Sequence, residues 1–264
     1  MKIRIFTKDD VICKEIARNL KAELMNENID IDEEAFNYAI SVGGDGTFLK
    51  MLRKCKFDPS INYIGINEGG LGFLTNLTPD EIPTFIEALK TDDLVKDDIP
   101  YLKIRVKSLD TKDDIILKAL NEISIKSSNL GTTTLNVSVS GSYLESLVGD
   151  GLIVSTPLGS SAYNKSIGGP IVNKKLEALT ITPIAPLNNN MNRSLTSSFV
   201  TCGTDRIDIV PTEESNDLIV SVDGVSYKLK GIESLEINLS EKRLPIYHLV
   251  GQDYIKKIYE KFVK

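Results

Sequence analysis

The 264-residue sequence predicts an α/β N-terminal domain with parallel βαβ units, then a β-rich, sandwich-like C-terminal domain and a closing C-terminal helix. Residues 1–99 alternate apolar strand patterns with helical patterns, which is typical of parallel βαβ units. After Pro100, strand-like runs follow one another, separated by Gly, Asn, Asp and Ser turns. We therefore expect domains at 1–99 and 100–252, and a helix over 253–264 that packs back on one of them.

In the first domain, the spacing of apolar residues defines each element. A helix over 11–25 carries Ile12, Ile16, Leu20 and Leu24 at intervals of four, which predicts one buried stripe. The other expected elements are helices at 47–54 and 79–89 and strands at 2–7, 38–42 and 63–66. Because helices connect these strands, the strands are expected to be parallel, with their C-terminal ends at one edge of the sheet.

In the second domain, polar and apolar residues alternate within short runs, as in half-buried antiparallel strands. The expected strands are 101–107, 115–126, 132–140, 152–155, 207–211, 218–222 and 235–239. At the C-terminus, Ile255, Ile258, Tyr259 and Phe262 stand at helical spacing, which predicts the closing helix.

Charge and composition exclude several classes of function. The net charge of −6 disfavours nucleic-acid and anionic-membrane partners, and no long apolar run interrupts the chain, so we expect a cytoplasmic protein. A catalytic triad would need His248, the one histidine, which lies between apolar neighbours and is better explained as structural. Chemistry is left to carboxylates, hydroxyls, backbone amides or a metal.

The first glycine-rich motif, Gly43-Gly44-Asp45-Gly46-Thr47, lies between an apolar strand and a helix. Backbone amides of such a turn, next to a helix N-terminus, suit phosphate, and glycine lets the backbone approach a ligand. The structural alternative is a tight turn with Asp45 as the N-cap. A cap does not need so many glycines, so we favour a site. The spacing differs from that of a P-loop.

A second glycine-rich motif, residues 67–73 (NEGGLGF), also follows a strand, and it should reach the same edge of the sheet as residues 43–47. Here Phe73 fits a core position and a ligand contact equally well.

Three motifs of the second domain are weaker evidence for a functional site when each is taken alone. The pair Asn121-Glu122 interrupts an apolar run and is best explained as its solvent-facing half. Residues 149–170 offer many hydroxyl and amide groups that suit a purine and a ribose, although a surface loop has a similar composition. Ala185 and Asp223-Gly224 are typical of strand ends or turns.

Taken together, and in this order, the motifs resemble those of the NAD kinase family, in its bacterial type. They are GGDGT (43–47), N-x-G-x-L-G-F (67–73), NE (121–122), the GDG and STP-x-GS-x-AYN-x-S sequences of 149–166, and Ala185. GGDGT alone also occurs in 6-phosphofructokinases and in diacylglycerol and sphingosine kinases, whereas the combination is specific.

The resemblance implies a kinase that phosphorylates the adenosine 2′-hydroxyl of NAD with ATP, or with polyphosphate, to give NADP. Asp45 would be the proton acceptor, Mg²⁺ or another divalent cation would accompany ATP, and no residue is assigned as a protein ligand of a metal. The amides of Gly43, Gly44 and Gly46 would hold phosphate. The residues that would bind NAD are Asp45, Gly46, Phe73, Asn121, Glu122, Asp150, Ser161, Ala162, Tyr163, Asn164, Lys165, Ser166 and Ala185.

The family likeness also implies a homodimer or homotetramer, because Asp150 matches a residue that contacts NAD from a subunit interface. No nucleic-acid or membrane partner is implied. Many bacterial members have an arginine where this chain has Val148, so one electrostatic contact to the pyrophosphate would be missing or supplied by another residue such as Arg193 or Lys165. Two alternatives stay open: a lipid kinase of the diacylglycerol or sphingosine type, and a dinucleotide-binding sensor without activity.

Overall fold

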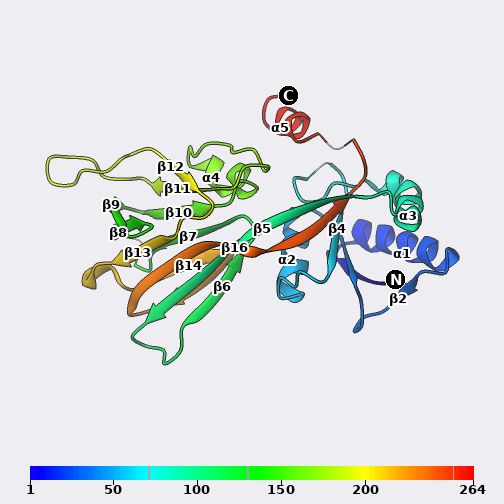
Figure 1. Cartoon of the computed structure of the whole chain (residues 1–264), viewed down its shortest axis with the longest axis horizontal. Coiled ribbons are helices and arrows are strands. Elements are labelled where there is room, and N and C mark those ends of the chain that lie inside the picture. The colour runs from blue at the N-terminus through cyan, green and yellow to red at the C-terminus, as the bar shows by residue number, and fades with distance from the viewer. Residues whose placement is uncertain (71, 130, 252) are drawn as a thin grey trace. The chain divides into compact units, whose positions relative to one another are not determined.

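The computed structural model describes residues 1–70, 72–129, 131–251 and 253–264. The chain forms two compact units (Figure 1): unit 1 comprises 1–99 and 242–264, and unit 2 comprises 100–241. Residues 242–252, expected in the second domain, thus group with the first. The reason is the length of strand β16 (Ile232–His248), whose last part pairs in parallel with β4 (Asn62–Ile66) through Ile246 and Tyr63.

Unit 1 contains a parallel sheet in the order β2-β1-β3-β4. Its remaining strands are β1 (Lys2–Thr7), β2 (Asp30–Ile31), β3 (Tyr38–Val42) and the start of β5 (Val95–Ser108). Its helices are α1 (Val11–Asn26), α2 (Asp45–Lys54), α3 (Ile82–Thr91) and α5 (Tyr254–Phe262), and a 3₁₀ turn, η1 (Pro79–Glu81), precedes α3. The predicted parallel βαβ units are confirmed.

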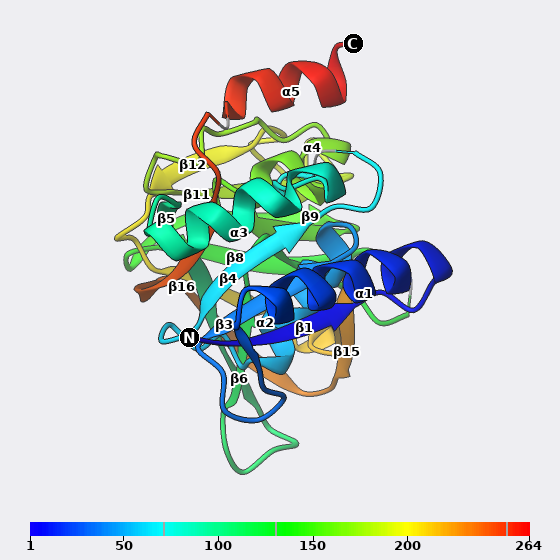
Figure 2. The same cartoon turned by 90° about the vertical axis from the view of Figure 1, so that its right-hand side faces the viewer.

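Helices α1 and α3 share one core with β1, β3 and β4, and Figure 2 shows both helices in front of these strands. The predicted stripe of α1 is correct for Ile16, Leu20 and Leu24 but wrong for Ile12, which is 61% exposed. Cys13 is buried in its place. A helical turn has 3.6 residues, so a stripe read at intervals of four drifts off the buried face.

Unit 2 consists of strands from two sheets. One sheet contains β6 (Ile115–Ala119), β8 (Thr133–Val139), β9 (Ser142–Gly149) and β13 (Ile207–Pro211), with parts of β5 and β16. The other has the order β12-β11-β10-β7-β14-β15, and all its pairs are antiparallel. These strands are β7 (Glu122–Ser127), β10 (Gly151–Ser155), β11 (Ala178–Ile184), β12 (Phe199–Cys202), β14 (Leu218–Val222) and β15 (Val225–Leu229). Short helical turns are η2 (Gly159–Ser161), α4 (Tyr163–Ser166) and η3 (Glu213–Ser215).

One apolar core, with residues from both sheets, fills unit 2 and confirms the predicted β-rich domain. The single strand expected over 115–126 is wrong, because the chain breaks between β6 and β7 at Leu120 and Asn121. Strands β9, β11, β12 and β15 were not foreseen.

No helix among the described residues is long and apolar enough to span a bilayer. The prediction that His248 is structural is confirmed: its side chain is 7% exposed, and Nε2 lies 3.2 Å from Oδ2 of Asp97. Helix α5 begins after Asp253, whose carboxylate accepts the N–H groups of Ile255 and Lys256 and so caps the predicted closing helix.

Candidate functional site

Asp45 is the first residue of α2, at the point where β3 ends. The alternative that Asp45 caps this helix is wrong, because the N-cap is Gly44, which has no side chain to cap with. Gly46, in the first turn, is exposed, and a Cβ on Gly44 or Gly46 would meet nothing within 4 Å. The space at the helix N-terminus is therefore open.

The Asp45 carboxylate bonds to the second glycine-rich loop instead. Its Oδ2 accepts the backbone N–H of Phe73 at 3.0 Å, while Oδ1 accepts those of Leu74 at 3.1 Å and Thr75 at 3.2 Å. The Thr75 hydroxyl donates to Oδ1 as well, at 3.0 Å, and accepts a bond from the buried Asn67 side chain at 2.7 Å. As predicted, both glycine-rich loops lie at one edge of the sheet.

Two glycines make this close approach possible. Gly43 has φ +141, and a Cβ there would lie 2.6 Å from the Thr47 hydroxyl oxygen. Its N–H donates to the carbonyl of Ile66 at 2.9 Å, so this amide holds the loop and is not available to a phosphate. A Cβ on Gly72 would lie 2.1 Å from Oδ1 of Asp45.

Phe73 lies between the two interpretations made for it, since it is half-buried and packs against α5. Its ring stacks on Phe262 with centroids 5.7 Å apart and meets Tyr254 edge-on at 6.0 Å, and the Lys261 ammonium lies 5.2 Å from its centroid. Leu71, in the same motif, lies outside the described residues.

Helix α5 also reaches this loop through a buried cation. Lys257 is 8% exposed, and its Nζ donates a hydrogen bond to the side-chain oxygen of Asn76. The C-terminal helix therefore supports the loop that supplies the amides around Asp45.

Lys8, directly after β1, is a residue that the motifs did not single out. Its Nζ lies 2.6 Å from Glu68 and 3.1 Å from Asp10, and these bonds raise its pKa. The Cys13 thiol donates to Glu68 at 2.7 Å, and burial raises its pKa to about 12, so it stays protonated. Lys8 thus occupies the place that a cation would take among these carboxylates. The rule that parallel strands end at one sheet edge would have found it.

In unit 2, Glu122 begins β7 and is buried, so the expectation of a solvent-facing pair is wrong for this residue, while Asn121 is half-buried. Burial, and next the charge of Asp223, raise the pKa of Glu122 to about 8, although a backbone N–H from Tyr163 acts the other way. Asp223 lies in a turn, as the sequence predicts, and its carboxylate accepts the N–H groups of Leu120 and Asn121. No sequence pattern shows that contact, because about a hundred residues separate the partners.

The loop between β10 and β11 divides its side chains between structural and accessible positions. Asn164 is fully buried, and its amide bonds to Ser160, Pro170 and Thr182. Ser161 is buried and donates to the carbonyl of Leu158 at 3.2 Å.

On the same loop, Tyr163 is half-buried, and its hydroxyl accepts a bond of 2.7 Å from Lys126, whose Nζ also lies 5.1 Å from the ring centroid. Ala162 and Lys165 are half-buried, and Ser166 is exposed.

Asp150 and Ala185 lie side by side where β10 and β11 pair. The Asp150 N–H donates to the carbonyl of Ile184 at 3.0 Å, and both predicted residues are exposed. Between them, a Cβ on Gly149 would lie 2.9 Å from the carbonyl oxygen of Ala185. Val148 is half-buried in β9 and accepts the N–H of Leu187 at 2.8 Å.

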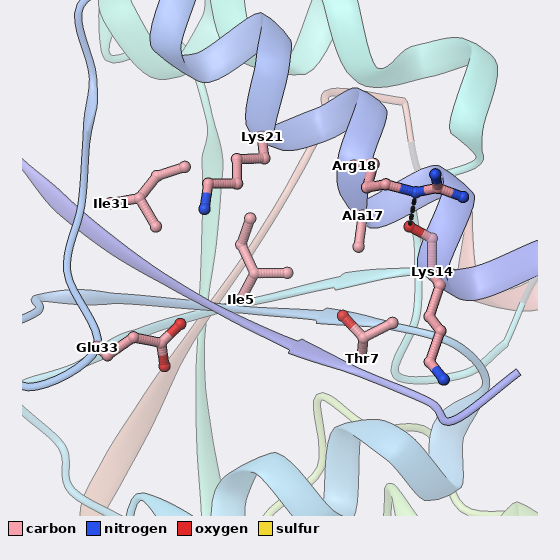
Figure 3. Close-up of a pocket in the computed structure, with 8 residues that line it drawn as sticks. All are labelled: Ile5, Thr7, Lys14, Ala17, Arg18, Lys21, Ile31 and Glu33. Atoms are coloured by element: carbon pink, nitrogen blue, oxygen red, sulfur yellow. Dashed lines mark hydrogen bonds between the residues drawn. The ribbon is translucent and has the colours of Figure 1, made fainter. Parts of the chain in front are cut away.

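A cavity of about 420 Å³ in unit 1 lies between α1 and the strands β1 and β2 (Figure 3). None of the predicted site residues lines it. Its lining residues are Ile5, Thr7, Lys14, Ala17, Arg18, Lys21, Ile31 and Glu33. The chemistry of the site therefore rests on the motif residues and not on this cavity.

Each unit thus assembles one group of predicted residues: the two glycine-rich loops in unit 1, and the Asn121–Glu122 and 149–185 segments in unit 2. Two family models match the same two regions. Residues 3–94 match the ATP-NAD kinase N-terminal domain, and residues 120–249 match the ATP-NAD kinase C-terminal domain.

Curated bacterial relatives are similar over nearly the whole chain. The NAD kinase of Latilactobacillus sakei is 33% identical over 92% of this chain and 91% of its own length. The NAD kinase of Enterococcus faecalis is 34% identical over 92% of both chains, and that of Staphylococcus carnosus is 31% identical over 100% of this chain and 98% of its own.

Two solved structures share the fold. Yeast NADH kinase complexed with NADH matches with a TM-score of 0.88 at 19% identity, over 99% of this chain and 87% of its own. An NAD kinase from Archaeoglobus fulgidus in complex with ATP matches with a TM-score of 0.73 at 24% identity, over 95% of this chain and 94% of its own. On the two domain models and the identity to curated relatives, the chain belongs to the ATP-NAD kinase family.

Proposed function

We propose that this protein is an NAD kinase that transfers the terminal phosphoryl group of ATP to the adenosine 2′-hydroxyl of NAD, giving NADP and ADP. Membership of the family supports the reaction class. The observation that carries the mechanism is the position of Asp45, at an open helix N-terminus and with its carboxylate oriented by three backbone amides.

Asp45 would accept the proton of the attacking hydroxyl through Oδ2. Among the described donors, Oδ1 accepts three bonds and Oδ2 accepts one, so Oδ2 keeps room for a ligand hydroxyl. Phosphoryl transfer passes through a loose transition state in which the hydroxyl loses its proton late. A fixed carboxylate acceptor therefore meets the demand of the step without a stronger base.

The phosphate donor would meet the N-terminus of α2. In the proposed site the amides of Gly44 and Gly46 remain for phosphate oxygens, while Gly43 shapes the turn. ATP would enter as its complex with Mg²⁺ or another divalent cation, which neutralises the charge on the transferring group. Lys8, at the same sheet edge, would add a positive charge if a phosphate displaced Glu68 or Asp10 from it.

Candidate residues for binding the dinucleotide occur in each group. Phe73 and Tyr163 offer aromatic faces, Asn121 and Glu122 offer polar groups, and Gly46, Asp150, Ala162, Lys165, Ser166 and Ala185 are exposed or half-buried. Ser161 and Asn164 would act indirectly, because their side-chain bonds fix the loop that carries Tyr163.

Three finer features belong to the same proposal. ATP is the proposed donor, with polyphosphate as the competing donor, and NAD is the proposed acceptor, with NADH as the competing acceptor. We also propose that the active species is a homodimer or homotetramer. A fully active monomer in light scattering at assay concentration would contradict the last point.

The deciding experiment incubates the protein with NAD, ATP and Mg²⁺ and measures NADP with an NADP-specific dehydrogenase. Parallel reactions replace ATP with polyphosphate, NAD with NADH (where the product measured is NADPH), or the protein with Asp45→Asn. NADP formation that depends on ATP and is lost in the variant supports the proposal. NAD binding without NADP formation in any reaction would leave the sensor function instead, and phosphorylation of diacylglycerol or sphingosine would favour the lipid kinase.

A further inference from the structure

Asp223 binds three consecutive backbone amides at the start of β7. Its Oδ2 accepts the N–H of Leu120 at 2.7 Å, and its Oδ1 accepts those of Asn121 at 2.8 Å and Glu122 at 3.3 Å. In return, the Asp223 N–H donates to the carbonyl of Glu122 at 3.1 Å. The backbone of the Asn121–Glu122 pair is thus fixed by one carboxylate.

The turn that carries Asp223 does not itself require that carboxylate to be buried. Asp223 and Gly224 join β14 to β15 in a two-residue hairpin, with φ +46 and +79. Such a turn accepts asparagine or glycine as readily as aspartate. Yet the Asp223 side chain points inward and the residue is 7% exposed. Its carboxylate therefore stabilises the segment at residues 120–122 and is not needed for the hairpin turn.

The carbonyl side of the same segment is held from the loop after β10. The Thr156 N–H donates to the carbonyl oxygen of Asn121 at 2.9 Å, and the Thr156 hydroxyl donates to the carbonyl oxygen of Leu120 at 2.7 Å. A Cβ on Gly159 would lie 2.1 Å from the Asn121 carbonyl oxygen, so the loop packs directly on this backbone. The segment is therefore bound on both sides, and Asn121 and Glu122 have one defined geometry.

Two buried polar atoms in this region lack a partner among the described residues: Oε2 of Glu122 and Oγ of Ser155. The two residues are direct partners in the β7–β10 register, so their side chains lie on the same face. Glu122 is 8% exposed and Ser155 is fully buried. Because buried polar atoms without partners are costly, this pair is suited to a polar group of a ligand.

We propose that Asp223 is a positioning residue of the dinucleotide site, which fixes the Asn121–Glu122 backbone and, through its buried charge, makes Glu122 a hydrogen-bond donor to a ligand hydroxyl. Ser155 would complete the contact from the opposite strand. This inference rests on the proposed function in that the ligand is NAD.

The charges around Glu122 favour its neutral form. Among the described residues, the charged group that acts on its carboxyl is Asp223, at the end of β14. Strand β10 presents the neutral Ser155, and the cations of β7 and α4 are Lys126, bonded to the Tyr163 hydroxyl, and Lys165. Burial and Asp223 together hold the pKa of Glu122 at about 8, so its carboxyl carries a proton at pH 7.

The test is the pH dependence of KM for NAD, at saturating Mg²⁺ and ATP, in the wild type, Asp223→Asn and Glu122→Gln. In the wild type, KM should rise as pH passes through about 8, because the ionised carboxylate no longer donates. In Asp223→Asn this bend in the KM profile should move to lower pH. At pH 7, KM for NAD should be raised about tenfold, and kcat should change less. Glu122→Gln has no group to ionise there, so its profile should lack the bend.

Asparagine tolerates the left-handed backbone at position 223, so the variant removes the charge while the turn stays intact. Asp92→Asn is the matched control, because Asp92 has φ +57 and is exposed in unit 1; its profile should match the wild type.

If Asp223→Asn does not fold, the wild-type and Glu122→Gln profiles still decide whether Glu122 acts as a neutral donor. Two results would overturn the inference while the proposed function stands. The first is a wild type that forms NADP but whose KM profile has no bend near pH 8. The second is a folded Asp223→Asn whose KM profile bends at the same pH as that of the wild type. A wild type that forms no NADP defeats the proposed function itself.

Discussion

Oδ2 of Asp45 accepts the backbone N–H of Phe73 at 3.0 Å across a separation of 28 residues. This bond joins the first turn of α2 to the loop after β4. The residue that we propose as the proton acceptor is thus also the residue that organises the second glycine-rich loop. Substitutions that disturb the contact between Asp45 and this loop should therefore affect both binding and catalysis, but to different extents.

Asp45→Asn should lower kcat by about 10²–10⁴-fold, because the amide cannot accept the hydroxyl proton. NAD affinity should change much less, since an asparagine oxygen can still accept loop amides. Initial rates and calorimetric titration with NAD measure the two effects. The matched control is Asp80→Asn, which changes an exposed carboxylate in η1 and should behave as wild type. Near-normal turnover in Asp45→Asn would rule out its role as the acceptor.

Gly72→Ala should abolish most of the activity, because its Cβ would lie 2.1 Å from Oδ1 of Asp45 and 2.2 Å from the Thr75 hydroxyl oxygen. The loop has to move away, and the three amides no longer orient the carboxylate. Gly70→Ala, two residues earlier, meets nothing within 4 Å and should keep the wild-type rate. Steady-state rates of the two purified variants, with circular dichroism to verify folding, provide the comparison. Equal rates in the two variants would contradict the role given to this contact.

Lys257→Met should loosen the loop around Asp45 and lower the free energy of unfolding by about 1–3 kcal/mol, because it removes the buried hydrogen bond from the Lys257 ammonium to Asn76. Hydrogen exchange at residues 72–76 should become faster, and kcat should fall. Lys256→Met is the control, because it changes the neighbouring exposed lysine, whose Nζ lies 3.9 Å from Oε1 of Glu260. Unchanged exchange in Lys257→Met would show that α5 does not support the loop.

Glu122 should make the protein less stable as pH rises. Its pKa is raised to about 8 in the folded protein, above the ordinary value of 4.5, so the folded state holds a proton that the unfolded state loses in this window. Stability should therefore fall between about pH 4.5 and 8. Each pH unit of that window is worth about 1.4 kcal/mol for a complete difference of one proton.

Urea unfolding of wild type and Glu122→Gln at pH 6 and 8.5 measures this effect. The variant should gain about 2 kcal/mol relative to wild type between the two pH values. A constant difference between the two proteins would mean that Glu122 titrates normally.

Much of the fold could be predicted from local pattern. Strands β1, β3, β13 and β14 have the bounds that apolar alternation predicts. The break between β6 and β7 could not be predicted in this way, because Asp223, distant in sequence, binds the amides of Leu120 and Asn121 and takes them out of a regular strand.

The candidate site divides in the same manner. The order of the motifs identified the family and selected Asp45, because glycine spacing and residue type are local properties of the chain. The partners of Asp45 and Glu122, the support from Lys257 and the place of Lys8 depend on which strand ends and loops meet. Periodicity records which face of an element is buried, but not which distant backbone amide a buried carboxylate will accept. Tertiary packing determines those partners, because a buried charge must be hydrogen-bonded and the fold decides which donors lie within reach.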